Sequence, residues 1–324
     1  MISFEKIKDL INNSKNIGLT YHVSPDGDAI GSLLALKCAL EKLNKNVEVF
    51  SKDNLQKNIS LKFLPKIGEI NGTNYVVNKE IDLLIIVDCG NLERVSCEFD
   101  LNKVDTLCVD HHISNDLYCK YNFIDSFSSS TGEIVYNLIK YLGLEIDKNI
   151  AICIYTSIMT DTGGLRFECS TQKTFNVVGE LVSTGIDFWN IYEKLFLSQT
   201  YEKIKLLGLV FEKLKIVDEK ICVIKVTNDM FEKSGATDEQ THDIASLGLT
   251  IENVEASIFI RNFKDKIKVS LRSKNNINVC EIAQKFGGGG HIKAAAFVTE
   301  LKMDEIEEIL LKEFRNVLSW LMEL

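Results

Sequence analysis

The feature that most constrains the fold is IDLLIIVDCG, residues 81–90, where five successive apolar residues stand between Asp82 and Asp88. A short apolar run without polar alternation is typical of a strand that is buried on both faces of a sheet. Further strands are predicted at residues 16–23, 47–50 and 104–112, and helices at residues 29–43, 131–144 and 151–164. This alternation predicts an α/β domain with a parallel sheet covered on both faces.

The last third of the chain differs, because apolar and polar residues alternate in KICVIKVT, VEASIFIRNF and KIKVSLRS. Alternation predicts a half-covered sheet, with helices in VCEIAQKF and in the terminal segment from residue 303. The alanines at 294–296, after the glycine run, are expected to be helical. We therefore predict an α/β protein with a parallel-sheet catalytic domain at 1–188, a helical linker at 189–214 and a smaller α/β substrate-binding domain at 215–324.

The net charge of −9 argues against a uniform basic face for long duplexes and favours a short anionic substrate. Nine cysteines are scattered without a C-x-x-C pair, so we expect buried free thiols rather than disulfides or a cysteine zinc site. The N-terminal segment reads as a short amphipathic helix rather than a signal peptide, and no apolar stretch has the length of a membrane span. These observations predict a cytoplasmic protein without a membrane partner.

Four apolar segments of the first domain end in acidic or imidazole side chains. Because ligands bind at the carboxyl ends of strands in an open α/β sheet, these groups are expected to converge. Taken singly, Asp26 or Asp28 would be read as a helix N-cap and Asp88 as a turn residue. The four groups are His22, Asp26 and Asp28; Asp88; Asp110, His111 and His112; and Asp161.

Crowded carboxylates repel one another unless cations lie between them, so the convergence predicts metal binding. Mixed oxygen and imidazole ligands suit manganese, magnesium or iron better than structural zinc. This many ligands suits two metal ions that share a carboxylate, which is an arrangement used in phosphoester hydrolysis.

In this order, HVSPDGDAIGS, VDCG, DHH and TDTGG resemble the four motifs of the DHH phosphoesterase superfamily. SLRS followed by GGGGHIKAAAF resembles its DHH-associated substrate domain, and the motifs together span about residues 15–300. Within the superfamily, the length and layout are similar to those of the bacterial nanoRNases. The resemblance implies a hydrolase that degrades short RNA and removes phosphate from 3′-phosphoadenosine 5′-phosphate (PAP).

The resemblance also implies roles for the clustered residues. Two divalent ions are expected, with manganese first and magnesium or cobalt as alternatives. Pro25 and Gly27 would allow a tight turn, so that Asp26 and Asp28 address different metals. His112 would face the substrate phosphate, and Asp110 would orient a neighbouring ligand. The implied metal ligands are His22 and Asp26 for one ion, Asp28, His111 and Asp161 for the other, and Asp88 as the bridge.

The glycine run and its flanks imply a nucleotide site. Glycines allow backbone N–H groups to approach a ligand, and a following helix would favour an anion; the alternative is a flexible surface loop. Arg272 would bind a phosphate with two hydrogen bonds, whereas Arg261 and Arg166 are weaker candidates. Ala296 replaces a glycine of the family pattern, which puts substrate size in doubt. The implied nucleotide contacts are Gly288, Gly289, Gly290 and His291.

Other functions stay open at this point. Within the same chemistry, the chain could be a linear or cyclic dinucleotide phosphodiesterase. A RecJ-type exonuclease is less favoured because no extra nucleic-acid-binding domain is evident, and an inorganic pyrophosphatase because the glycine run suggests a nucleotide. From another class, a non-catalytic nucleotide-binding module would predict decayed ligand positions, yet all are intact. The expected partners are short single-stranded RNA, dinucleotides or PAP-type nucleotides; the oligomeric state is open, a homodimer included.

Overall fold

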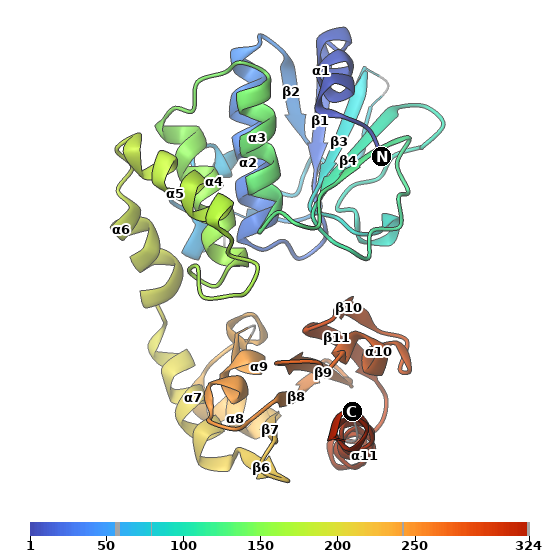
Figure 1. The fold of residues 1–324 in the computed structure, drawn as a ribbon, viewed down its shortest axis with the longest axis vertical. Helices are drawn as coiled ribbons and strands as arrows, with labels where there is room; N and C mark the ends of the chain where they lie inside the picture. The colour runs from blue at the N-terminus through green and yellow to red at the C-terminus, as the bar shows by residue number, and fades with distance from the viewer. Residues whose placement is uncertain (56–58, 79, 242, 323–324) are drawn as a thin grey trace. The chain divides into compact units, whose positions relative to one another are not determined.

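The computed structural model describes residues 1–55, 59–78, 80–241 and 243–322. The chain forms two compact units, Met1–Ser198 and Gln199–Leu324, each with its own sheet (Figure 1). The division falls within residues 189–214. Among the described residues, no helix combines the length and the apolar character needed to cross a membrane.

The first unit is built on a parallel sheet with the strand order β2-β1-β3-β4-β5. All four pairings are parallel, and the pairs Ile17↔Leu83 and Val87↔Val109 keep the carboxyl ends of β1, β3 and β4 at one edge. This confirms the predicted fold class. The strands are β1 Asn16–Thr20, β2 Asn46–Val49, β3 Leu83–Val87, β4 Asp105–Asp110 and β5 Tyr121–Ile124.

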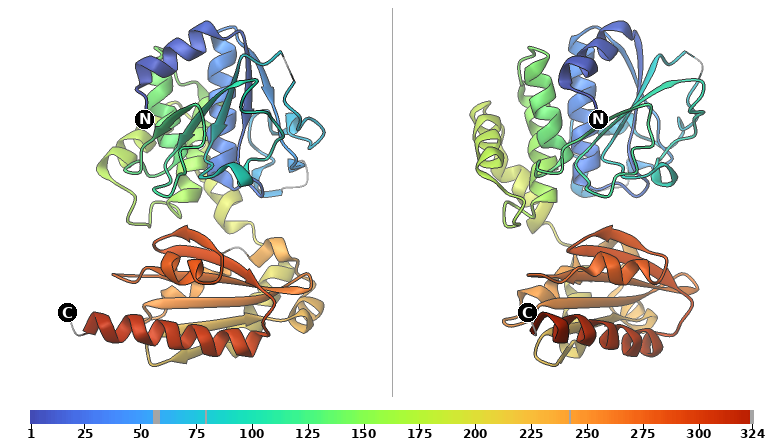
Figure 2. Two further views of the ribbon diagram at one scale, coloured as in Figure 1. Left: turned by 90° about the vertical axis from the view of Figure 1, so that its right-hand side faces the viewer. Right: turned by 45° about the vertical axis from the view of Figure 1, so that its right-hand side comes forward.

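Both faces of this sheet are buried, but by different means. On one face, Leu83, Ile85 and Val87 share a core with residues of α1 to α4; α2 and α3 contact the strands, and α4 packs against α2 and α3 (Figure 1, and Figure 2, right). The other face packs Leu84 and Ile86 against irregular segments that carry Val95, Cys97 and Cys119. The helices are α1 Phe4–Asn13, α2 Gly27–Lys42, α3 Thr131–Tyr141, α4 Lys148–Asp161, α5 Gln172–Ser183 and α6 Phe188–Tyr192, with a π-helical turn at Glu193–Leu197 and short 3₁₀ turns at Ile59–Leu61, Ile67–Glu69 and Leu92–Arg94.

Helices α2 and α4 lie close enough that glycine is required between them. A Cβ atom at Gly31 would lie 2.4 Å from the carbonyl oxygen of Cys153, and one at Gly27 would lie 2.4 Å from Cγ2 of Thr160. Helix packing therefore requires a glycine at position 27, in addition to the role expected of Gly27 in the turn. The left-handed residue of that turn is Ser24, with φ 55°.

The second unit has a mixed sheet with the order β10-β11-β9-β8-β7-β6, in which only the β7–β8 pairing is parallel. The predicted alternation is confirmed for β9 but is wrong for β7 and β8, which are buried almost throughout because apolar clusters cover both of their faces. The elements are α7 Tyr201–Lys213, β6 Lys215–Val217, β7 Ile221–Val226, α8 Asn228–Ser234, a 3₁₀ turn Asp238–Thr241, α9 Ile244–Leu247, a 3₁₀ turn Gly248–Thr250, β8 Ala256–Phe263, β9 Lys266–Ser273, α10 Val279–Gln284, β10 Gly289–His291, β11 Ala294–Thr299 and α11 Met303–Met322.

The segment after the glycine run is a strand, so the expected helix at 294–296 is wrong. Helix propensity is a weak preference that tertiary packing overrides. Residues 294–299 pair with β9 along their whole length, and the alternate residues Ala295 and Phe297 are buried in the core with α10 and α11. The helix N-terminus that was expected to favour an anion is therefore not there.

Candidate metal centre

The acidic and imidazole groups of the first unit converge at the carboxyl edge of its sheet. They form three overlapping groups, and within each group the potential ligand atoms lie within 4.8 Å of one another. Asp88 and His111 each belong to two groups, so the groups form one continuous cluster. The groups are His22, Asp26 and Asp88; Asp28, His111 and Asp161; and Asp88, His111 and His112.

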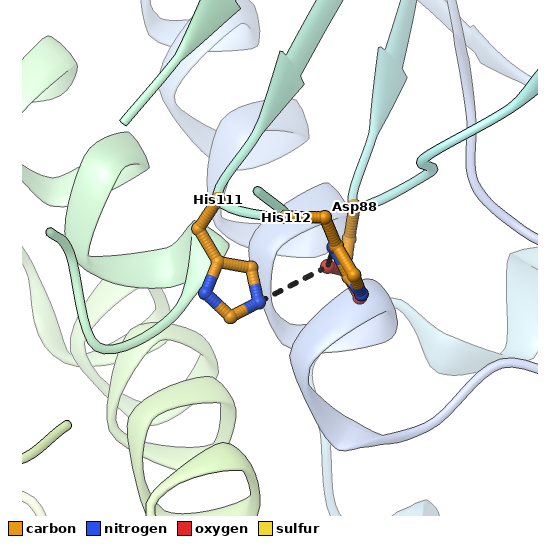
Figure 3. Close-up of side chains that lie close together, drawn as sticks. All are labelled: Asp88, His111 and His112. Carbon is orange, nitrogen blue, oxygen red and sulfur yellow. Dashed lines mark ion pairs between the residues drawn. The ribbon is translucent and has the colours of Figure 1, made fainter. Parts of the chain in front are cut away.

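Asp88 belongs to two of the three groups, and Figure 3 shows it beside His111 and His112. It follows β3 in a left-handed conformation, with φ 53°, and its N–H donates to the carbonyl of Val109. Its Oδ1 lies 3.7 Å from Nε2 of His111 and 3.5 Å from Nδ1 of His112, while Oδ2 lies 3.5 Å from Nε2 of His22. Burial alone would raise the pKa of Asp88, but these three imidazoles hold it below its usual range.

His22 and Asp26 come from the turn between β1 and α2. Nδ1 of His22 lies 3.0 Å from the carbonyl of Val23, which leaves Nε2 facing Asp88. Burial lowers the pKa of His22, yet Asp88 and Asp26 outweigh it and raise the pKa to about 9. Asp26 is also the N-cap of α2, since its Oδ1 accepts from the N–H groups of residues 28 and 29. Asp26 is therefore both the N-cap of α2 and a member of the cluster.

Asp28 is 1% exposed, and its carboxylate accepts hydrogen bonds from four donors. Its burial, together with the charges of Asp88 and Asp161, raises its pKa well above the usual value. Two of its donors are backbone N–H groups at the start of α3, where the helix dipole favours negative charge. The donors are the hydroxyls of Ser32 at 2.9 Å and Ser157 at 2.5 Å, and the N–H groups of Thr131 at 2.9 Å and Gly132 at 3.1 Å.

Thr131 links the two halves of the cluster. Besides its N–H contact with Asp28, its hydroxyl donates to Oδ1 of Asp88 at 3.1 Å. Sequence reasoning missed this residue, because a Ser/Thr run before a helix signals only an N-cap, which here is Ser130. Ser32 and Ser157 were missed as well, and no sequence pattern distinguishes them from other buried serines.

His111 and Asp161 complete the far side of the cluster. Nε2 of His111 lies 3.6 Å from both Oδ2 of Asp28 and Oδ2 of Asp161, which is the last residue of α4. Burial lowers the pKa of His111, but the surrounding aspartates raise it to about 9. Burial and the charges of Asp26 and Asp88 raise the pKa of Asp161 to about 7 despite the opposing charge of His111.

Asp110 orients His112. Its Oδ1 lies 2.6 Å from Nδ1 of His112, and its Oδ2 accepts from Nδ2 of Asn115 at 2.7 Å. Asp110 is fully buried, which alone would raise its pKa, but the contact with His112 holds the pKa below its usual value. The same contact raises the pKa of His112 against the effect of burial. Asn115 was not anticipated from the sequence.

The donor set fits divalent cations. Carboxylate oxygens and imidazole nitrogens suit manganese, magnesium or iron, and burial together with the charges of neighbouring aspartates raises the pKa of Asp28 and Asp161. A cation placed among them would relieve the repulsion between these charges. The arrangement can therefore hold metal ions between Asp88 and the groups on either side of it.

Arg272 and His291, two of the candidate nucleotide residues of the second unit, share one sheet face. His291 pairs with Ala294, which pairs with Arg272, and directly paired residues point to the same side. Gly289 and Ala296 form the next pair on that face. A Cβ at Gly288 would lie 2.3 Å from the carbonyl oxygen of Ala296, whereas one at Gly289 would meet nothing within 4 Å.

The two weaker arginine candidates have local partners. Arg261 is buried, forms an ion pair with Asp238 and stacks over Phe263, which indicates a structural role. Arg166 is exposed, and its Nε donates to the carbonyl of Gly163. Gly290 adopts φ 143° and needs to be glycine for that reason. Of the glycines expected to contact nucleotide, only Gly289 has no such structural requirement.

Both units of this chain are similar in sequence to known protein domains. Residues 16–158 match the DHH family N-terminal domain, and residues 218–319 match the DHHA1 domain. A bifunctional oligoribonuclease and PAP phosphatase NrnA from Thermus thermophilus is 31% identical over 305 residues, covering 94% of this chain and 90% of that protein. The enzyme of the same name from Bacillus subtilis is 28% identical over 292 residues, covering 89% of this chain and 90% of that protein.

A solved structure is similar along the whole length. The crystal structure of an exopolyphosphatase-related protein from Bacteroides fragilis superimposes with a TM-score of 0.85 at 27% identity, covering 98% of this chain and 97% of that one. The sequence motifs, both domain matches and the near full-length relatives agree. The chain belongs to the DHH family, with an N-terminal DHH domain and a C-terminal DHHA1 domain.

Proposed function

We propose that this protein is a two-metal phosphoesterase that degrades short RNA oligonucleotides to mononucleotides and converts PAP to AMP. The observation that carries the proposal is the continuous cluster in which Asp88 stands between His22 and His111. Membership of the DHH family supports a phosphoester hydrolase, and the relatives named oligoribonuclease and PAP phosphatase support these substrates.

The cluster divides into two ligand sets. We assign manganese to both sets, with magnesium or cobalt as alternatives. Bound divalent cations would supply a water of lowered pKa and would neutralise charge on the phosphoryl oxygens. The assigned ligands are His22 and Asp26 on one side, Asp28, His111 and Asp161 on the other, and Asp88 between them.

In this proposal, His112 donates a proton to the leaving oxygen, and Asp110 positions the His112 ring. Asp110 accepts the proton of Nδ1, which fixes the tautomer and the orientation of the imidazole. The contact with Asp110 outweighs burial and raises the pKa of His112, which favours the protonated ring. His112 therefore donates a proton from Nε2 to the leaving oxygen as a general acid, a role that typically contributes about 10²- to 10⁴-fold to rate.

The second unit contributes nucleotide contacts. Arg272 and His291 share a sheet face with Gly289, whose missing Cβ leaves room for a base or ribose. We assign phosphate binding to Arg272 and nucleotide binding to Gly288, Gly289, Gly290 and His291. Ala296 lies on the same face, and its methyl group leaves less space for the nucleotide than the glycine of the family pattern would.

The test is a hydrolysis assay with manganese and three substrates: a 5′-labelled RNA dinucleotide, a five-nucleotide RNA and PAP. Mononucleotide release from both RNAs with phosphate release from PAP is the expected result, and Asp88→Asn should abolish both. Asp105→Asn is the matched control, since Asp105 is a half-buried aspartate at the opposite end of β4, paired with Lys120. Cleavage of the dinucleotide alone would replace the proposal with a dinucleotide phosphodiesterase.

A further inference from the structure

Arg94 lies beside the metal cluster and has no role so far. Its Nη2 is 3.2 Å from Nδ1 of His22, on the other side of the imidazole from Asp88. Its backbone is fixed, because its carbonyl accepts from the N–H of Val23 and its N–H donates to Oδ1 of Asn91. The side chain itself is solvent-accessible.

Arg94 and His22 are not stable hydrogen-bond partners in a metal-binding cluster. When Nε2 of His22 binds a cation, the ring proton resides on Nδ1 and is donated to the carbonyl of Val23, which lies 3.0 Å away. Arginine is only a donor, so it cannot bond to a protonated Nδ1. No carboxylate among the described residues lies within 4.0 Å of the Arg94 guanidinium. The positively charged guanidinium of Arg94 therefore lies next to a candidate metal site, and no carboxylate of the described residues is paired with it.

The charges of the cluster indicate what that partner is. Five aspartates line it, namely residues 26, 28, 88, 110 and 161. With all five ionised and His112 protonated as proposed, two divalent cations would leave the cluster with no net charge. A phosphodiester is itself an anion, so a further positive charge at the rim of a neutral cluster would favour its entry.

We propose that Arg94 binds the phosphate group of the substrate at the His22 side of the cluster. This rests on the proposed phosphoesterase function and adds a binding residue on the catalytic unit. The guanidinium presents paired N–H donors that match two phosphate oxygens, and Arg94 approaches from the side of His22 that faces away from Asp88. The ligand class is a phosphate monoester or diester.

The test compares Arg94→Gln and Arg94→Lys with the wild type. Arg94→Gln is expected to raise KM for the RNA dinucleotide about tenfold to hundredfold, with kcat changed by less than about threefold. Manganese affinity should stay the same or rise, because a positive charge next to His22 is removed. Arg94→Lys should recover part of the lost affinity. Lys120→Gln, which removes the same charge at the amino end of β5, should change neither quantity.

A structural role for Arg94 would give a different pattern, because a displaced His22 would weaken metal and substrate binding together. That result, or an unchanged KM in Arg94→Gln, would overturn the inference. Binding of inorganic phosphate to the manganese-loaded protein, measured by calorimetry, tests Arg94 without turnover. If the wild type hydrolyses none of the three substrates, the proposed function fails, while weaker phosphate binding by Arg94→Gln would still support the phosphate contact.

Discussion

Thr131→Val isolates one hydrogen bond that supports the metal cluster. Valine keeps the shape of threonine but loses the hydroxyl that donates to Oδ1 of Asp88 at 3.1 Å. The backbone N–H contact between residue 131 and Asp28 is independent of the side chain and persists. Any change can therefore be assigned to Asp88 rather than to a general loosening of α3.

The size of the effect follows from burial. Thr131 is fully buried and Asp88 is 2% exposed, so water cannot replace the lost donor. A hydrogen bond to a charged group contributes about 1.5–3 kcal/mol, and the loss of a group that orients a metal ligand typically weakens metal binding about 10- to 100-fold. We expect Thr131→Val to raise the manganese dissociation constant by that factor. At saturating manganese, kcat should recover most of its value.

Calorimetric titration with manganese measures this directly, and Thr131→Ser is the matched control because it retains the hydroxyl. Thr131→Ser should bind manganese within about threefold of the wild type. Equal losses in both variants would assign the effect to altered packing around residue 131 rather than to the hydroxyl. Wild-type affinity in Thr131→Val would refute the idea that the hydroxyl supports Asp88.

Three further predictions follow. Asp110→Asn should lower kcat about 10- to 100-fold, because it removes the charge that holds Nδ1 of His112, while calorimetry should find manganese affinity nearly unchanged. Manganese binding should release protons at pH 7, and its affinity should rise up to about pH 9, because the metal displaces protons from His22 and His111, whose pKa values are about 9 without metal. Calorimetric titrations in buffers of different ionisation enthalpy would measure the proton release. An affinity that does not depend on pH would contradict this prediction. Gly289→Ala should leave the melting temperature unchanged but weaken AMP binding, whereas Gly179→Ala, equally unobstructed but inside α5, should stabilise the protein by about 0.5–1 kcal/mol without affecting AMP.

The sequence predicted the catalytic fold because its strands are apolar on both faces and its helices follow them in order. The convergence of Asp88 and His111 also followed, since the parallel strands β3 and β4 leave their carboxyl ends at one edge, whereas Asp161 reaches the cluster from the end of helix α4. The sequence could not indicate that irregular segments, rather than helices, cover Leu84 and Ile86. Such coverage depends on the paths of residues 89–104 and 113–119, which lack a periodic pattern.

The failures share a cause. The alanines at 294–296 have high helix propensity, yet pairing with β9 and burial of Phe297 decide their structure. Thr131 and Asn115 act only through other side chains, and their residue types are common in turns and caps. Their contribution depends on contacts between distant segments, and one sequence contains no record of those contacts.

Gly31 shows how far the chemistry constrains residues that never meet a substrate. It lies one turn along α2 from Asp28 and faces the carbonyl of Cys153 on α4, the helix that ends in Asp161. Any larger side chain at position 31 would push α2 from α4 and so separate two aspartates of the same cluster. Selection acting on hydrolysis would therefore remove substitutions at this buried position, and an evolutionary record of the protein would show Gly31 to be as restricted as the ligands themselves.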